Sequence, residues 1–125
     1  MTREMAVLVI DDEHEASLVA SAIALHAPRL VVRTVLDWRA ALADLAEGKP
    51  SARLIIAGAR AIANAENALP FLRDEISVVG LAPDISAAVR ERAVAAGIRA
   101  IYDRPTNWEK YAETVRVILR DGLGA

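Results

Sequence analysis

The feature that most constrains this chain is the aliphatic run Val7–Ile10, which Asp11 and Asp12 follow directly. Four aliphatic residues in succession are typical of a short strand that is buried on both faces, as in a parallel sheet covered by helices. The two carboxylates come where such a strand must leave the core. Because open α/β sheets build their sites at the carboxyl ends of parallel strands, this acidic pair is the first place to look for chemistry.

The rest of the chain alternates short apolar strands with helical segments. The predicted strands are Met5–Ile10, Leu30–Val35, Leu54–Ala57, Ile76–Leu81 and Arg99–Tyr102. The predicted helices are Glu13–Ala27, a segment from Asp37 to Gly48, a short one ending near Asp74 after a loop at Gly58–Asn64, one capped by Asp84 or Ser86 and stopped by Gly97, and a last one opened by a Thr106–Glu109 capping box. Such alternation favours right-handed crossovers and a parallel sheet between helical layers.

Composition narrows the possible class of protein. The chain has 125 residues, of which 54% are hydrophobic and 26% charged, as expected for one packed domain. A net charge of −2, with no basic cluster, gives no reason to expect direct contact with nucleic acid. Cysteine is absent, which excludes thiol chemistry, and no apolar run is long enough to span a bilayer. We therefore expect a cytoplasmic protein that needs no cofactor and contacts no membrane.

The order of three motifs resembles a response-regulator receiver (CheY-like) domain. These motifs are the strand and acidic pair Val7–Asp12, the segment Ala95–Ala100 leading into the fifth strand, and Tyr102–Pro105 after it, where Arg replaces the family's Lys. The resemblance covers nearly the whole chain. It implies one α/β domain over residues 1–125, a flavodoxin-like (βα)5 fold in three layers with a parallel sheet of strand order 2-1-3-4-5.

Typical receivers transfer a phosphoryl group to an Asp at the end of strand three, with Mg²⁺ held by that Asp and the acidic pair. Here the acidic pair is present as Asp11 and Asp12, but the phosphoacceptor position falls on Gly58, or on Ala57 with a one-residue slip. Neither residue is a nucleophile. Two carboxylates alone hold Mg²⁺ poorly, so we expect no metal at this pair under ordinary conditions.

The positions that contact phosphoryl oxygens in the family are also changed. The hydroxyl position falls on Ala82 and the lysine position on Arg104, while the switch aromatic falls on Ile101. Tyr102 is adjacent and should face the other side of its strand. Since a guanidinium can bind a carboxylate with two hydrogen bonds, we expect Arg104 to pair with Asp11 or Asp12 in place of the missing cation.

These positions predict a degenerate pseudo-receiver, without enzyme activity, that acts through protein–protein contacts. A narrower resemblance is to the N-terminal receiver-like domain of FleQ-type flagellar regulators, which are sigma-54-dependent transcription activators. It depends on Ile10–Asp12, on Asp37-Trp38-Arg39 after strand two, and on the positions of Gly58, Gly80 and Pro105. The alternative is a stand-alone receiver that is still phosphorylated, or still binds Mg²⁺, at an atypical site.

The partner surface is predicted from the distribution of aromatic residues. Tyr102, Trp108 and Tyr111 gather near the last helix, and Tyr and Trp are favoured anchors of interfaces. We therefore expect a homodimer or contact with an attached or separate output domain there. His14 and His26 have no carboxylate arranged to orient them, and we interpret both as surface helix residues.

Overall fold

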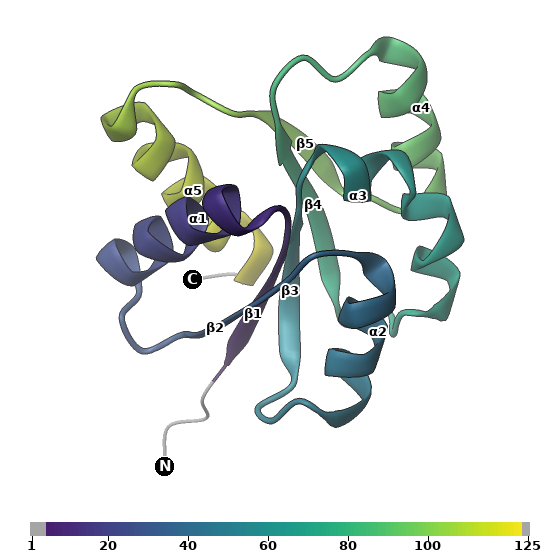
Figure 1. Cartoon of the computed structure of the whole chain (residues 1–125), viewed down its shortest axis with the longest axis horizontal. Coiled ribbons are helices and arrows are strands. Elements are labelled where there is room, and N and C mark those ends of the chain that lie inside the picture. Colours follow the sequence, from purple (N-terminus) through teal and green to yellow (C-terminus); the bar gives the residue numbers. More distant parts are fainter. Residues whose placement is uncertain (1–4, 124–125) are drawn as a thin grey trace.

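The computed structural model describes residues 5–123 as a five-stranded parallel sheet with helices on both faces (Figure 1). The strands are β1 (Ala6–Ile10), β2 (Val31–Val35), β3 (Ala52–Ala57), β4 (Ser77–Ala82) and β5 (Ala100–Asp103). The helices are α1 (Glu13–His26), α2 (Trp38–Glu47), α3 (Ala59–Ala63), α4 (Ala87–Ala96) and α5 (Trp108–Leu123), with 3₁₀ turns η1 (Ala65–Asn67) and η2 (Leu69–Phe71). The strand order β2-β1-β3-β4-β5 confirms the predicted fold class.

The core has two halves because the sheet is covered on both faces. All five residues of β1 are buried, and they alternate between the halves: Leu8 packs toward α2, α3 and α4, while Val7 and Val9 pack toward α1 and α5. This arrangement explains why the strand is a continuous aliphatic run. No helix in the part of the chain described is long and apolar enough to cross a membrane.

Helix ends follow several of the signals expected from the sequence. The Asp12 carboxylate accepts the Glu15 N–H at 2.9 Å and caps α1, and Asp37 caps α2 in the same way. Of the two candidates before α4, Ser86 is the cap, accepting the Val89 N–H at 3.2 Å. Gly97 ends α4 with φ +120°, a left-handed backbone that favours glycine.

Three local predictions are wrong. In place of the short helix predicted to end near Asp74, the chain has the two 3₁₀ turns η1 and η2, the second of which ends at Phe71. The segment predicted as a loop at Gly58–Asn64 contains α3, because Ala61 and Ile62 can be buried against the sheet when this stretch turns helical. The Thr106–Glu109 capping box does not form. Instead Asn107 caps α5, accepting the N–H groups of Glu109 and Lys110 at 2.9 and 3.2 Å. Asn107 directly precedes the first residue of α5, so its side-chain oxygen lies close to the free N–H groups of the first turn.

Candidate functional site at the carboxyl edge of the sheet

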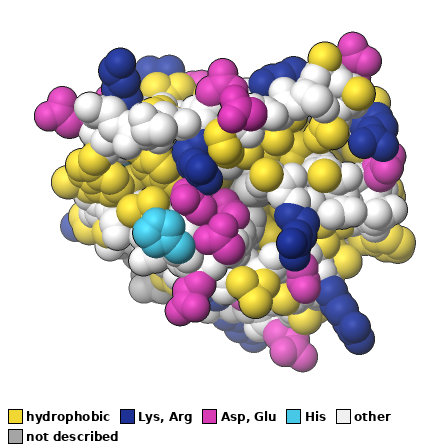
Figure 2. Space-filling model, turned by 45° about the horizontal axis from the view of Figure 1, so that its top comes forward, with side chains coloured by type: hydrophobic (Ala, Val, Ile, Leu, Met, Phe, Trp, Pro, Cys, Tyr) yellow, Lys and Arg dark blue, Asp and Glu magenta, His cyan; other side chains and the backbone are white. Residues whose placement is uncertain are grey.

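A cavity of about 420 Å³ lies at the carboxyl edge of the sheet, where the acidic pair leaves β1. It is lined by Ile10, Asp11, Asp12, Leu36, Gly58, Ala59, Arg60, Ala61, Pro83 and Arg104. On this face of the molecule, Asp and Glu side chains gather near the centre with Lys or Arg side chains on either side (Figure 2). The fold therefore brings the predicted pair, the phosphoacceptor position and the lysine position to one site.

The position of Gly58 is taken up by the carboxylate of Asp11. The Gly58 N–H donates to the Ile10 carbonyl at 2.8 Å, which places its Cα directly across from Asp11. A Cβ added to Gly58 would lie 2.6 Å from Asp11 Oδ1 and closer still to Asp11 Cγ and Oδ2. Ala57 pairs with Ile10 inside the sheet and is fully buried. Gly58 is therefore the residue that faces the acidic pair, and no larger side chain fits there unless Asp11 moves.

Ala82, at the hydroxyl position, also lacks a polar side chain. Ala82 ends β4, is 1% exposed, and its carbonyl accepts the N–H of Arg104 at 3.2 Å. Its methyl group offers no donor or acceptor to a ligand in the cavity. The edges of β3 and β4 thus contribute only backbone and small apolar groups to this site.

Arg104 pairs with Glu15, so the predicted pairing with Asp11 or Asp12 is wrong. Arg104 Nη1 lies 3.0 Å from Glu15 Oε2, and both side chains are largely buried. The N–H does not point along this contact, so it is an ion pair without hydrogen-bond geometry, and Glu15 Oε2 has no hydrogen-bond partner among the described residues. Asp12 is occupied with capping α1, while Glu15 projects from the first turn of that helix toward β5. Glu15 is not among the predicted site residues, and its place at the start of the predicted helix Glu13–Ala27 is the one signal that could have indicated it.

Several charged side chains lie close together around Asp11, and they shift its pKa. Burial raises the pKa of Asp11, and the neighbouring charges of Asp12 and Glu15 raise it further, while the hydrogen bond from the Asp12 N–H (2.8 Å) and Arg104 lower it. Burial also raises the pKa of Tyr111, whose hydroxyl is buried without a hydrogen-bond partner in residues 5–123. Glu15 and the acidic pair act on Tyr111 in the same direction.

The residues present do not fit the Mg²⁺ site that the receiver resemblance implies. Such a site needs a third carboxylate at the position of Gly58, which instead is covered by Asp11. Within residues 5–123, no three His, Cys, Asp or Glu side chains are grouped closely enough to hold an ion. His14 is an exposed residue of α1, and exposed His26 contacts the Ala112 carbonyl from the far end of that helix, with 2.8 Å between Nε2 and the oxygen.

The three aromatic residues predicted as interface anchors have different environments. Trp108 is 44% exposed and stacks on Tyr111, with ring centroids 5.9 Å apart. Tyr102 is partly buried against the core on the side of α5, facing away from Ile101 as predicted. Tyr111 is only 4% exposed, so its prediction as a direct contact is wrong: its place on the inner face of α5 makes it a core residue. Of these three aromatic residues, only Trp108 exposes a large part of its ring to solvent.

Comparisons with known proteins identify the fold. No family model and no curated protein match the sequence. Among solved structures, a response regulator from Hahella chejuensis matches with a TM-score of 0.79 and 20% identity, covering 96% of each chain. The phosphorylated cyanobacterial phytochrome response regulator RcpA matches with a TM-score of 0.77 and 20% identity, covering 98% of this chain and 95% of that one.

A longer protein matches as well. NtrX from Brucella abortus superposes with a TM-score of 0.75 and 17% identity over 98% of this chain, which corresponds to 27% of the NtrX chain. The three matches are 17% to 20% identical to this chain, which is enough to show a shared fold at these TM-scores and too little to transfer a chemical role. The chain has the CheY-like fold of response-regulator receiver domains.

Proposed function

We propose that this chain is a phosphorylation-independent receiver domain that signals through protein–protein contacts. The observation that carries the proposal is the placement of the Asp11 carboxylate over Gly58, where a receiver would carry its phosphoacceptor. Without a nucleophile there, an acyl phosphate cannot form at this position. Arg104, which would contact a phosphoryl group, is engaged with Glu15.

We further propose that the domain regulates transcription in the cytoplasm as the N-terminal part of a sigma-54-dependent, FleQ-type flagellar regulator. The residues that suggested this resemblance have structural roles consistent with it. Asp37 caps α2, and the indole N–H of Trp38 donates to the Ala61 carbonyl at 2.8 Å, joining α2 to α3. The match to one part of the longer NtrX chain supports a domain within a larger regulator. Homodimer formation or contact with the output domain through Trp108 belongs to the same proposal.

The central test is chemical phosphorylation. The chain is incubated with acetyl phosphate and Mg²⁺, and separately with beryllofluoride and Mg²⁺, beside a receiver that carries the complete Asp, Thr and Lys set. We expect a mass gain and a Mg²⁺-dependent fluorescence change in the control receiver and neither in this chain. A stable mass gain that maps to one carboxylate would overturn the proposal and favour the alternative of an atypical phosphorylation site.

A further inference from the structure

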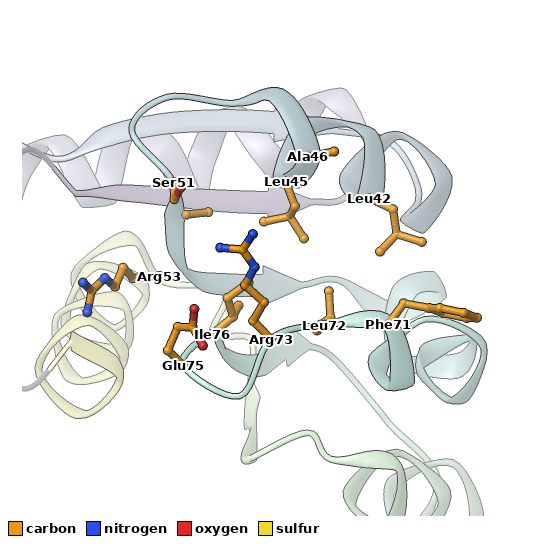
Figure 3. Close-up of a pocket in the computed structure, with 11 residues that line it drawn as sticks. Leu42, Leu45, Ala46, Ser51, Arg53, Phe71, Leu72, Arg73, Glu75 and Ile76 are labelled. Atoms are coloured by element: carbon orange, nitrogen blue, oxygen red, sulfur yellow. The ribbon is translucent and has the colours of Figure 1, made fainter.

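A groove runs along α2 beside the carboxyl-edge cavity, with which it shares Leu36, Arg60 and Ala61. None of its lining residues belongs to α4, β5 or α5. It consists of two hollows that share Leu42. The first, of about 470 Å³, lies between the start of α2 and the α3–η1 segment. The second, of about 380 Å³, lies between the end of α2 and the segment around η2 (Figure 3). We call this surface the α2 groove, and the α2 residues that line it run from Trp38 to Ala46.

The two ends of the α2 groove expose large apolar side chains. Leu36 is 68% exposed beside the first hollow, and Phe71 is 75% exposed beside the second. The other exposed large hydrophobic residues, Leu25, Val94 and Trp108, lie singly on three different helices. Among the described residues, two such side chains border the neighbouring hollows of the groove, one at each end, which is typical of an interaction surface.

Arginines give the groove a positive charge. Arg39 and Arg60 line the first hollow, and the guanidinium of Arg73 points into the second, toward Leu45 (Figure 3). Within residues 5–123, none of these three arginines takes part in an ion pair. Of the two carboxylates in the lining, Asp37 is engaged in capping α2, which leaves Glu75. The lining of the groove is thus basic on a chain whose net charge is −2, while Arg60 also borders the adjoining cavity that holds Asp11 and Asp12.

We propose that the α2 groove binds an acidic amphipathic helix of a partner protein. The ten residues of α2 span about 15 Å, so the groove suits a helix of about three turns lying along it. Apolar residues of that helix at spacings of three and four would contact Leu36, Leu42 and Phe71, and its acidic residues would face the arginines at the two ends. The exposed apolar area favours a protein helix over nucleic acid, which would offer phosphate to the arginines but nothing to Phe71. This proposal does not rest on the chemistry proposed at Gly58, although the first hollow adjoins the cavity there through Leu36, Arg60 and Ala61.

The test uses the whole chain with Trp108→Phe, which leaves Trp38 in the wall of the first hollow as the sole tryptophan. The probes are two synthetic amphipathic helices with identical leucine stripes, one with Glu and one with Lys at the flanking positions. We expect the Glu peptide to shift Trp38 fluorescence and the backbone amide resonances of α2, α3 and η2. The Lys peptide should bind at least about tenfold more weakly, because its charges oppose the arginines.

Three variants localise the binding. Two variants in the groove should each lower the affinity for the Glu peptide by about tenfold or more. These are Phe71→Ala and the double variant Arg39→Glu with Arg73→Glu. Arg92→Glu on α4 makes one such charge reversal outside the groove and should have little effect. Equal binding of both peptides, resonance shifts outside the groove, or no binding at millimolar peptide would overturn the proposal. So would a duplex DNA that displaces the Glu peptide at a lower concentration, or a dimer that Phe71→Ala dissociates.

Discussion

The carboxyl-edge cavity has two sides that differ in kind. On the side of β3 and β4, Gly58 and Ala82 present no polar side-chain atom. On the side of β1, α1 and β5, Asp11, Glu15 and Arg104 crowd together around a buried tyrosine. A receiver that forms an acyl phosphate needs both sides, because the nucleophile and the hydroxyl lie on the first and the acidic pair and cation on the second.

We call the side of β1, α1 and β5 the charged side and the side of β3 and β4 the bare side. The groups of the charged side have structural roles in the absence of a ligand. Asp12 caps α1, Glu15 and Arg104 tie α1 to the segment after β5, and Asp11 covers Gly58. Each of these groups has a structural partner inside the chain. By contrast, a carboxylate at Gly58 or a hydroxyl at Ala82 would have no such second role in this structure. The charged side therefore has structural roles in this fold that need no phosphoryl group, whereas the bare side offers no group for phosphoryl chemistry.

The largest effect should come from rebuilding the bare side with Gly58→Asp. The new side chain must displace Asp11 and break the hydrogen bond from the Asp12 N–H, and it places a third carboxylate beside the pair. We expect a loss of about 2 kcal/mol in the free energy of unfolding without metal. Added Mg²⁺ should restore part of it, since three carboxylates can hold the ion where two cannot. Urea unfolding with and without Mg²⁺ measures both effects.

Gly58→Ala is the matched control for that experiment. It adds the same Cβ, whose nearest neighbours are the end atoms of a flexible carboxylate, but no charge. We expect a smaller destabilisation that Mg²⁺ does not change. If Gly58→Asp unfolds at the same urea concentration as the unmodified chain in the absence of metal, Asp11 does not cover Gly58 as described.

The ion pair on the charged side should have the next largest effect. Glu15→Gln leaves the partly buried Arg104 guanidinium without its counter-charge and should lower the free energy of unfolding by about 1 kcal/mol. Combining it with Arg104→Met should cost less than the two changes added together. The exposed pair Glu113–Arg116 is the control, and Glu113→Gln should change stability much less than Glu15→Gln, because solvent screens the exposed charges. Additive effects of the two changes at the first pair would contradict the coupling.

The sequence predicted the fold well because each strand and helix is indicated by its own residues, and the strand–helix pattern recurs along the chain. The aliphatic runs, the cap expected at Asp84 or Ser86 and the stop at Gly97 each indicate the start or end of an element independently of the others. It also placed Asp11, Gly58 and Arg104 at one edge. It could not choose the partner of Arg104, because that choice depends on which of three nearby carboxylates points toward β5. The α2 groove was missed for a similar reason: Leu36 and Phe71 are ordinary apolar residues until the fold leaves them exposed.

A smaller effect is expected from Tyr111→Phe. The Tyr111 hydroxyl is buried with no hydrogen-bond partner in the described chain, so removing it should leave stability unchanged or raise it by up to about 1 kcal/mol. Tyr111→Leu, which also removes the stacking on Trp108, should be destabilising in the same thermal unfolding assay. A clear loss of stability in Tyr111→Phe would mean that the hydroxyl has a partner, and that the charged side is held together differently.

The smallest effect concerns the charge of Asp11 itself. Its pKa is raised in the folded chain, chiefly by burial, so ionisation opposes folding. The carboxyl reduces stability at pH values above its folded-state pKa, and this effect disappears as the pH falls toward its ordinary value of 3.8. Asp11→Asn keeps an oxygen that can accept the Asp12 N–H but removes the charge. We therefore expect the variant to be slightly more stable than the unmodified chain at neutral pH, with the difference shrinking as the solution is acidified. A variant that is less stable at neutral pH would mean that the carboxylate is favoured where it lies, and that Arg104 neutralises it after all.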